Sequence, residues 1–363
     1  MDDNIFNISK KINDLSYQAE NDLIDIYKGV DDICYINTLK ILKCFKDNRV
    51  STTHFNSSSG YGYDNIGREV IEKIYASIFD TEKALVRSQF INGTHAISTA
   101  LFAILRNNDE LLYITGTPYD TLHETIGITE NSLSLKNLGV KYNQIELKNK
   151  VIDIDSVVDY IKNNKVKVIA MQRSKGYADR KTLSINYIKE VVCKIREVDN
   201  DVCILVDNCY GELTDICEPT SVGADICCGS LIKNIGGGLC ETGAYIVGKE
   251  VYVDLCADRL NGPGMGYECG ATLYQNRNIL QGLFLAPNVV SSAIKSMIFA
   301  SYMLDKLGFD TYPKYTEKRD DIIQTVKFKT EKELISFIQG IQNMSPIDSF
   351  LTLEPWDMPR LYK

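Results

Sequence analysis

The apolar residues of the first 45 positions recur at intervals of three and four, the spacing of one face of an amphipathic helix. Ile8, Ile12 and Leu15 begin this pattern, which continues to Phe45. It predicts an N-terminal helical arm over residues 1–55. The small and glycine-rich residues 57–63 then predict a loop, and renewed apolar periodicity predicts a helix over residues 66–79.

Beyond residue 83, short apolar runs of strand length alternate with helical stretches. The runs cover residues 84–90, 110–115, 166–172, 202–207, 224–230 and 242–248. This alternation predicts a three-layer α/β domain with a mostly parallel sheet over residues 56–288. After Pro287 the pattern predicts a helix over 289–307, a strand over 322–328 and a helix over 331–341, which indicates a smaller α+β domain over 289–363.

Composition and charge narrow the function classes. The net charge of −8 and pI of about 5.1 repel nucleic acid and anionic membrane surfaces. The N-terminal residues lack a signal-peptide pattern, and no apolar run approaches about 18 residues, so we expect a cytoplasmic protein. Eleven cysteines without C-x-x-C spacing and three histidines without H-E-x-x-H spacing argue against a disulfide framework and a metal site.

A loop that follows the first predicted strand is a candidate anion site. Gly93 and Thr94 open the next helix, with His95 after them. The free N–H groups of a helix's first turn and the Thr94 hydroxyl suit a phosphate monoester. The alternative is that Thr94 only caps the helix and that His95 is an ordinary polar residue.

Two charged residues follow later strands. Asp207 ends an apolar strand, where a buried carboxylate requires a cationic partner, and Lys233 follows the next strand among apolar neighbours. We expect desolvation to lower the pKa of Lys233, which would favour a nucleophilic amine. The alternatives are an ordinary ion pair for Asp207 and a surface position for Lys233. The glycines at 236–238 predict a flexible turn.

A phosphate seat, an acid and a lysine in this order fit a pyridoxal 5′-phosphate (PLP) site on an α/β sheet. At these residues the chain resembles fold-type I PLP enzymes, and more closely the methionine γ-lyase-like or aluminium-resistance family. The matching runs span nearly the whole chain and lie at residues 60–68, 93–96, 111–121, 172–177, 206–212, 229–238, 270–273 and 354–359.

The resemblance assigns roles to individual residues. It implies that Lys233 forms the internal aldimine and later moves the substrate Cα proton, and that Asp207 holds the pyridine nitrogen protonated. Gly93, Thr94 and Ser230 would bind the phosphate, with His95 beside them. Tyr119 would stack on the cofactor ring, although a tyrosine of the core is the alternative reading.

The resemblance also implies a shared active site. Tyr61, Tyr63 and Arg68 would reach the phosphate of a neighbouring subunit, which implies a homodimer or homotetramer. Arg173 is a candidate for binding the carboxylate of an amino-acid substrate, because guanidinium suits bidentate contact with oxyanions. A structural ion pair is the equal alternative for Arg173.

The implied activity is that of a carbon–sulfur lyase similar to methionine γ-lyase and cystathionine β-lyase. Such an enzyme eliminates a thiol from a sulfur amino acid and yields a 2-oxo acid and ammonia. Family chains continue beyond the 354–359 run, so the small domain is expected to be truncated at Lys363. The alternatives are another PLP-dependent reaction of amino acids, or a homologue that binds PLP without turnover.

Overall fold

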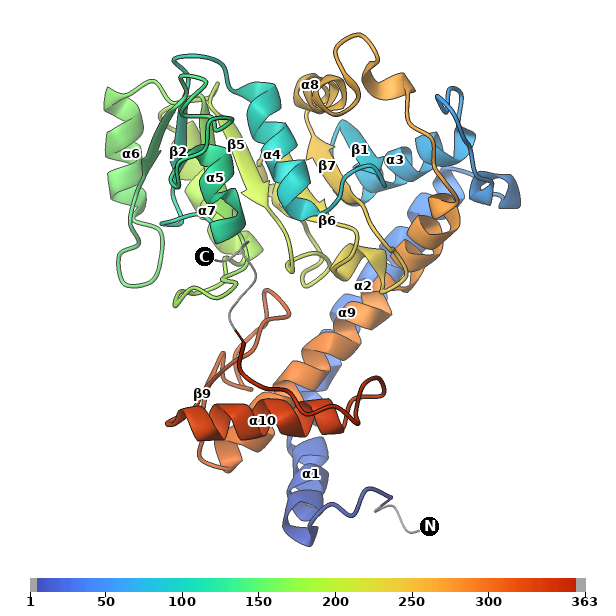
Figure 1. The fold of residues 1–363 in the computed structure, drawn as a ribbon, viewed down its shortest axis with the longest axis vertical. Coiled ribbons are helices and arrows are strands. Elements are labelled where there is room, and N and C mark those ends of the chain that lie inside the picture. The colour runs from blue at the N-terminus through green and yellow to red at the C-terminus, as the bar shows by residue number, and fades with distance from the viewer. Residues whose placement is uncertain (1–4, 357–363) are drawn as a thin grey trace. The chain divides into compact units, whose positions relative to one another are not determined.

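Seven strands form the main sheet of the protein, a computed structural model of which describes residues 5–356. In spatial order they are β1 (Lys83–Arg87), β7 (Ala244–Gly248), β6 (Ile226–Ser230), β5 (Cys203–Asp207), β4 (Val168–Gln172), β2 (Glu110–Tyr113) and β3 (Lys141–Gln144). The strands from β6 to β3 are parallel, and β7 runs antiparallel to both β1 and β6 (Figure 1). The expected α/β fold with a mostly parallel sheet is confirmed.

Helices connect the strands and extend the chain at both ends. They are α1 (Lys10–Asp22), α2 (Ile24–Asp47), α3 (Ile66–Ile78), α4 (Gly93–Ile104), α5 (His123–Ile126), α6 (Ile154–Asn163), α7 (Ile185–Arg196), α8 (Glu250–Asn261), α9 (Gln275–Lys306) and α10 (Glu331–Asn343). A second sheet pairs β8 (Asp310–Tyr312) with β9 (Thr325–Lys327) in antiparallel register. The sequence pattern therefore located six of the seven main strands, together with α3 and α10, to within a few residues.

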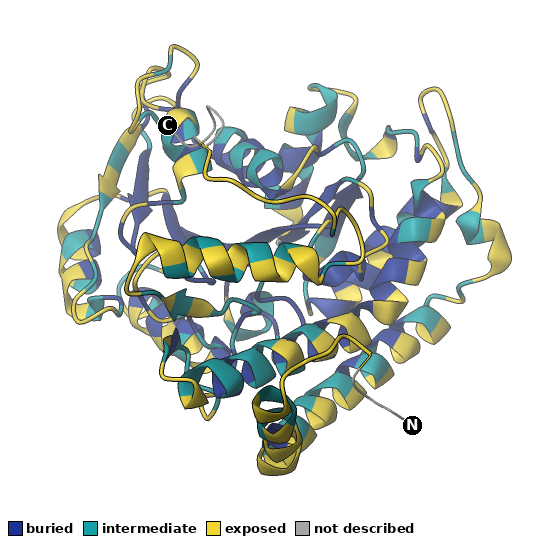
Figure 2. Ribbon diagram, turned by 60° about the horizontal axis from the view of Figure 1, so that its bottom comes forward, coloured by how far each residue is buried: buried dark blue, intermediate teal, exposed yellow. Residues whose placement is uncertain are grey.

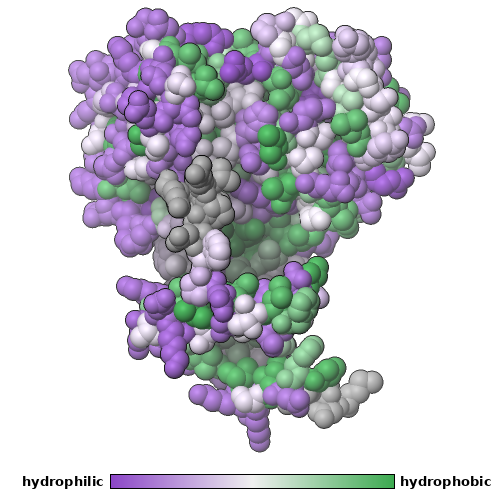
Figure 3. Space-filling view, viewed as in Figure 1, coloured by the Kyte–Doolittle hydropathy of each residue, from purple (hydrophilic) through white to green (hydrophobic). Residues whose placement is uncertain are grey.

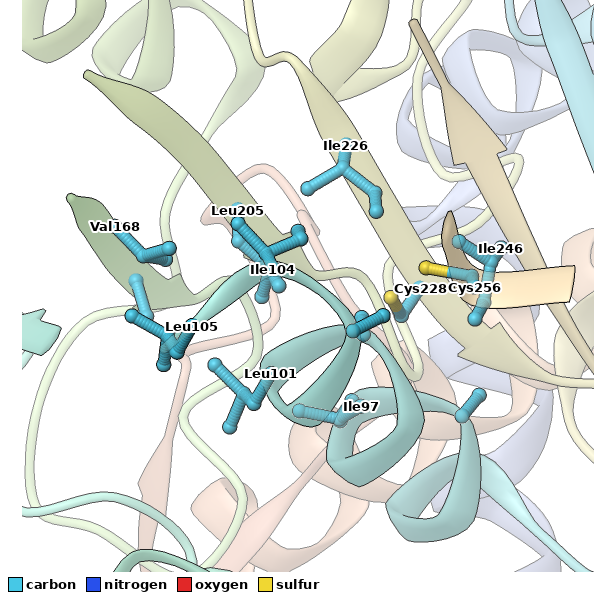
Figure 4. Packing of buried hydrophobic residues seen from close by; sticks show 14 of the residues in the cluster. Ile97, Leu101, Ile104, Leu105, Val168, Leu205, Ile226, Cys228, Ile246 and Cys256 are labelled. Atoms are coloured by element: carbon cyan, nitrogen blue, oxygen red, sulfur yellow. The ribbon is translucent and has the colours of Figure 1, made fainter. Parts of the chain in front are cut away.

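The hydrophobic core lies between the sheet and helices α4 and α8. Ile97 and Leu101 of α4 belong to one buried cluster with Leu205 and Ile226 of the strands (Figure 4). Full burial of each such aliphatic side chain stabilises the fold by roughly 1.5–3 kcal/mol. Alternate strand residues such as Ile204 are equally buried on the other face, and the central strands β5, β6 and β7 are buried along their whole length (Figure 2). Both faces of the sheet are thus covered, as a three-layer arrangement requires.

The chain forms two compact units. The large unit comprises Gly29–Ile294 and Asp320–Ile323, and the small unit comprises the remaining described residues, including Lys295–Arg319. The expected boundaries at residues 55 and 288 differ from these, because the structure divides the chain inside α2 and α9. Within the small unit, α10 has no buried residue (Figure 2). The end of the 354–359 run and Arg360 lie outside the described residues.

Two elements differ from the sequence-based expectation for physical reasons. β3 was not predicted because its four residues, KYNQ, are polar and lie at an edge of the sheet, where burial is incomplete. α9 begins at Gln275 instead of residue 289 and continues through Pro287. A proline removes one helical hydrogen bond, yet the apolar residues on both sides are buried and keep the helix continuous.

The apolar sequence of α9 packs inside protein. Among the described residues, α9 is the one helix with the length and composition needed to cross a membrane. In this fold, however, Leu280, Leu283 and Ala286 are fully buried within the large unit. Hydrophilic side chains are spread over the face of that unit seen in Figure 3. One side of α9 is therefore buried in the large unit, whereas Phe284, Leu285 and Val289 remain partly exposed.

Glycines bring α9 against the turn that follows Lys233. A Cβ atom on Gly282 would lie 2.2 Å from the carbonyl oxygen of Gly236, and one on Gly237 would lie 2.1 Å from the carbonyl oxygen of Gly282. Gly237 also has a φ of +55°. The glycines at 236 and 237 therefore form a closely packed crossing of two backbones, and the expectation of a flexible turn is wrong for them.

We expect Gly282→Ala to destabilise the protein, because the added methyl group would overlap a backbone oxygen that cannot move aside. The expected loss in the free energy of unfolding is about 1–3 kcal/mol. Gly29→Ala is the matched control, since Gly29 is also helical but a Cβ atom there meets nothing within 4 Å. In urea denaturation, the free energy of unfolding of Gly29→Ala should equal or slightly exceed that of the wild type. Equal effects of the two changes would contradict the close crossing.

Candidate active site

A cavity lies at the carboxyl ends of β4, β5 and β6, where the sequence analysis placed the chemistry. All of its lining residues belong to the large unit. They are Thr94, Ile97, Tyr119, Thr121, Leu122, Gln172, Ser174, Gly176, Asp207, Cys209, Tyr210 and Lys233. Four of the predicted site residues, Thr94, Tyr119, Asp207 and Lys233, therefore lie around one space although they are far apart in sequence.

Asp207 supplies a buried carboxylate at this cavity. It is the last residue of β5, and its Oδ1 accepts a hydrogen bond of 3.0 Å from the backbone N–H of Cys209. Burial raises the pKa of Asp207, and the positive charge of Lys233 opposes this effect. Lys233 lines the same cavity and supplies the positive charge that offsets the burial of this carboxylate.

Lys233 enters the cavity from the loop after β6. Its Nζ lies 3.9 Å from the centroid of the Tyr210 ring. The side-chain amide of the next residue, Asn234, donates hydrogen bonds of 3.0 Å to the carbonyl oxygens of Tyr210 and Glu212. These contacts join the loop that carries Lys233 to the turn that follows Asp207.

The expected lowering of the pKa of Lys233 is wrong. Burial does lower this pKa, but the negative charges of neighbouring groups, including Cys209 and Asp207, raise it further than burial lowers it. Because burial raises the pKa of the Cys209 thiol well above its usual range, that thiol is neutral near pH 7. Asp207 is then the anionic partner that keeps Lys233 protonated.

The start of α4 forms the second side of the cavity. Asn92, not Thr94, caps the helix, since its Oδ1 accepts a hydrogen bond of 2.9 Å from the N–H of His95. The Thr94 hydroxyl instead lies 2.9 Å from that of Thr121, beside the cavity. A Cβ atom on Gly93 would lie 3.3 Å from Cβ of Ser230, so the helix start packs against the end of β6.

His95 is half-buried and lies outside the lining of the cavity. Its Nδ1 accepts a hydrogen bond of 3.2 Å from the N–H of Ile91, and its ring packs edge-on against Phe90. Burial lowers the pKa of His95. The imidazole therefore stabilises the loop before α4. Because His95 is not part of the cavity wall, its contact with a cofactor stays a prediction.

Tyr119 lines the cavity and is held between aromatic and backbone neighbours. Its ring stacks on that of Tyr177, with centroids 6.0 Å apart and planes inclined by 22°. A Cβ atom on Gly176 would lie 3.7 Å from the Tyr119 ring. The loop after β4 therefore fixes the plane of Tyr119, which suits a residue that stacks on a planar group.

Arg173 has a structural role in this fold, so the expected contact with substrate carboxylate is corrected. Its guanidinium is fully buried, lies 3.4 Å from the Glu218 carboxylate and donates to Asn208 Oδ1 at 2.8 Å and to Thr214 Oγ1 at 3.1 Å. It is not among the residues of the cavity wall. The ion pair that the sequence analysis kept as an alternative is the one observed.

The 60–68 loop does not reach the cavity of its own chain. Tyr61 and Tyr63 are exposed and stack on each other with centroids 5.5 Å apart. Arg68 is buried, and it donates hydrogen bonds to the carbonyl oxygens of Gly62, Glu268 and Gly270. Arg68 therefore stabilises the loop from within, while the two tyrosines present an aromatic surface to solvent.

The sequence analysis missed several residues around the cavity. Ser174 lies two residues beyond Gln172, the polar end of β4, so the same strand-end argument that located Asp207 would have found it. Asp321 could not have been found in this way. Its carboxylate accepts hydrogen bonds from the hydroxyls of Ser174, at 2.7 Å, and of Thr182. These partners are more than a hundred residues away in sequence, and only the fold brings them together.

A second carboxyl group, that of Glu212, lies behind Asp207 and Lys233. It is fully buried, and its Oε1 accepts a hydrogen bond of 3.0 Å from the Tyr245 hydroxyl. Burial, assisted by the charge of Glu218, raises the pKa of Glu212 to about 8. A Cβ atom on Gly229 would lie 2.6 Å from Oε1, so only glycine leaves room for this pair. Glu212 is therefore a neutral hydrogen-bonding group near pH 7.

Fold and comparisons together define an α/β protein with the fold-type I architecture. The family model described as methionine gamma-lyase matches residues 12–363. The chain belongs to the methionine γ-lyase family. The residues around the cavity suit PLP. Asp207 supplies a buried carboxylate and Lys233 supplies an amine. Gly93 packs tightly on Ser230, and the hydroxyls and helix N–H groups beside them suit a phosphate.

Individual relatives agree with this placement. An uncharacterized protein of Bacillus subtilis, YnbB, is 48% identical over 94% of this chain and 82% of its own length. A carbon-sulfur lyase involved in aluminum resistance from Clostridium novyi NT is 46% identical, with a TM-score of 0.94 over 97% of this chain and 84% of the other. The pyridoxal-5′-phosphate-dependent protein YhfS of Escherichia coli, 14% identical, has a TM-score of 0.64 over 87% of this chain and 81% of its own, and shares the fold.

The raised pKa of Glu212 predicts a pH dependence of stability. In the folded protein this carboxyl holds its proton up to about pH 8, whereas its ordinary value is 4.5. The stability that Glu212 contributes is therefore complete below about pH 4.5 and is lost as the pH rises through 8. Glu212→Gln keeps a neutral group there, and we expect its free energy of unfolding to exceed that of the wild type by at least about 1.4 kcal/mol at high pH.

Denaturation curves from about pH 5 to 9 test this expectation, with the exposed Glu190 on α7 changed to glutamine as the matched control. The difference between Glu212→Gln and wild type should widen with pH, while the control should follow the wild type. Parallel curves for all three proteins would show that Glu212 is ionised in the folded state.

Proposed function

We propose that this protein is a PLP-dependent carbon–sulfur lyase that acts on a sulfur amino acid. The overall reaction consumes one water and converts the amino acid into a thiol, a 2-oxo acid and ammonia. The observation that carries the proposal is the meeting of Asp207 and Lys233 at the ends of neighbouring parallel strands, beside the hydroxyls at the start of α4. The description of the Clostridium novyi relative as a carbon-sulfur lyase supports this choice of reaction.

Different residues of the cavity would bind different parts of PLP. The N–H groups of Gly93 and Thr94 and the hydroxyls of Thr94 and Ser230 would hold the phosphate. Asp207 would stabilise a proton on the ring nitrogen, because a buried carboxylate interacts strongly with a nearby positive charge. Tyr119 would stack on the ring face. PLP itself, when bound, accepts the electron pair left on the substrate carbon after proton loss.

Lys233 would perform the proton transfers. Its Nζ would take the proton from the substrate Cα after the amino acid has displaced it from the cofactor, and the released thiol would gain a proton in turn. Asp207 is among the groups that raise the pKa of this amine, which favours its protonated form before PLP is bound. The same pairing implies that uptake of PLP by Lys233 becomes faster as the pH rises.

A second subunit is part of this proposal. Tyr61 and Tyr63 are exposed, stacked and carried by a loop that Arg68 stabilises. Exposed aromatic side chains of this kind are typical of subunit interfaces. The two tyrosines would complete the phosphate site of the neighbouring chain, so a homodimer is the smallest active form.

Absorption spectra with added PLP test the cofactor and its lysine. We expect wild-type protein to turn yellow and to retain the cofactor covalently after borohydride reduction, and Lys233→Ala to lose this covalent attachment completely. Lys189→Ala, which removes an exposed lysine of α7, is the control and should behave like the wild type. A well-folded wild-type protein without an absorption band would overturn the assignment.

Thiol release tests the reaction once the cofactor is bound. Cystathionine and methionine should be offered separately, with a thiol reagent and a 2-oxo acid assay as parallel readouts. We expect equal amounts of thiol and 2-oxo acid from at least one of them, with activity reduced by about a thousandfold or more in Lys233→Ala because the group that moves the Cα proton is gone. Normal cofactor binding without thiol release would contradict the lyase reaction and favour another use of PLP.

A further inference from the structure

Tyr210 has an uncommon backbone conformation at the floor of the cavity. Its φ is +70°, in the left-handed region that residues with a Cβ rarely adopt. Such a conformation costs about 1–3 kcal/mol and persists where the surrounding structure enforces it. Here the carbonyl oxygen of Tyr210 accepts a hydrogen bond from Asn234, the neighbour of Lys233. The strain therefore belongs to the turn that holds the lysine loop.

The same turn is fixed from its other side by α2. The buried Asn37 donates hydrogen bonds of 3.1 Å to the carbonyl oxygens of Leu213 and Asp215. Leu213 also has a positive φ, +62°. Tyr210 and Leu213 both have a left-handed backbone conformation, and the carbonyl oxygen of each accepts a hydrogen bond. The fold therefore fixes the position of the Tyr210 ring.

That ring lies under the amine of Lys233. The distance of 3.9 Å from Nζ to the ring centroid is well inside the range at which an ammonium group and an aromatic face attract each other. Lys233 is half-buried, so water is partly excluded from this contact. The charged or titratable groups that also influence the amine are Asp207, Cys209 and Glu212.

We propose that Tyr210 is a positioning residue for Lys233, whose ring face holds the protonated amine at the cavity wall whenever that amine is not attached to the cofactor. This inference rests on the proposed function, in which substrate displaces Lys233 and the free amine must stay within reach of the Cα proton. The ring acts through its face, so its hydroxyl is dispensable and its hold does not change with pH near neutrality.

Two features of the contact make the proposal specific. Asp207 attracts the amine by charge but does not define a direction, whereas a ring face fixes where the ammonium group lies. The proposal therefore predicts different effects for Tyr210 and Asp207. Loss of the ring should lower the pKa of Lys233 moderately, whereas loss of the carboxylate removes the main charge that raises it.

Labelling of cofactor-free protein tests the contact without any enzymatic reaction. Acetic anhydride, which reacts with neutral amines, is applied over a range of pH, and acetylation of Lys233 is followed by peptide mass spectrometry. We expect Tyr210→Leu to shift the labelling midpoint of Lys233 downward by about 0.5 to 1 pH unit, the size of a partly desolvated cation–π contact. Tyr210→Phe should leave the midpoint unchanged. The exposed Lys189 serves as the internal standard.

Tyr210→Asn guards against a folding artefact. Asparagine tolerates the left-handed region better than leucine, so this variant removes the ring with less backbone strain. It should show the same downward shift as Tyr210→Leu. A midpoint equal to the wild type in both ring-free variants would overturn the proposal, and so would an equal shift in Tyr210→Phe, which would assign the effect to the hydroxyl.

Kinetics of the PLP-loaded protein provide a second readout. We expect Tyr210→Asn to lower kcat several-fold with little change in KM, because the ring acts on the free amine after substrate has bound. Failure to bind PLP would defeat the proposed function but leave the labelling result intact. A shifted labelling midpoint with unchanged kcat would overturn the positioning role, since the contact would then exist without serving the reaction.

Discussion

The burial of two opposite charges, Asp207 and Lys233, is the constraint around which the rest of the site is arranged. Neither residue is stable alone in an apolar interior, because an unpaired buried charge is costly. The parallel arrangement of β5 and β6 solves this problem by ending both strands at one edge of the sheet. Once the pair exists, the groups around it have to be neutral or hydrogen-bonded, and Glu212, Cys209 and Tyr210 meet that requirement.

The polar network behind this pair explains several residues that have no direct place in the chemistry. Arg173 neutralises Glu218, and Asn208 links the two, so that the end of β5 is braced by an ion pair fully excluded from water. Loss of either partner leaves a buried charge unpaired, which is expected to destabilise the fold by more than the intact pair stabilises it. The network gives the cavity floor a single arrangement, which a site that orients a proton transfer needs.

The fold could be predicted because its signals are local. Apolar runs bounded by polar residues marked six of the seven main strands, and the order of strand and helix indicated a parallel sheet. β3 carried no such signal because an edge strand need not be apolar. Asp207 and Lys233 were recognisable because both directly follow buried strands. The pKa of Lys233 was not, since its sign depends on which charges the fold brings near the amine, and the sequence neighbours of Lys233 are all uncharged.

Asp321 shows that the division between the two units is not a place where the chain can be cut. The four residues Asp320–Ile323 belong to the large unit, whereas the residues on both sides of them belong to the small one. A shortened protein ending at Ile294 would therefore lose the acceptor for the hydroxyls of Ser174 and Thr182, and the cavity wall that carries Ser174 would lose its support. For protein engineering, the large unit is thus discontinuous in sequence, and a single segment ending at Ile294 leaves out the four residues that complete it.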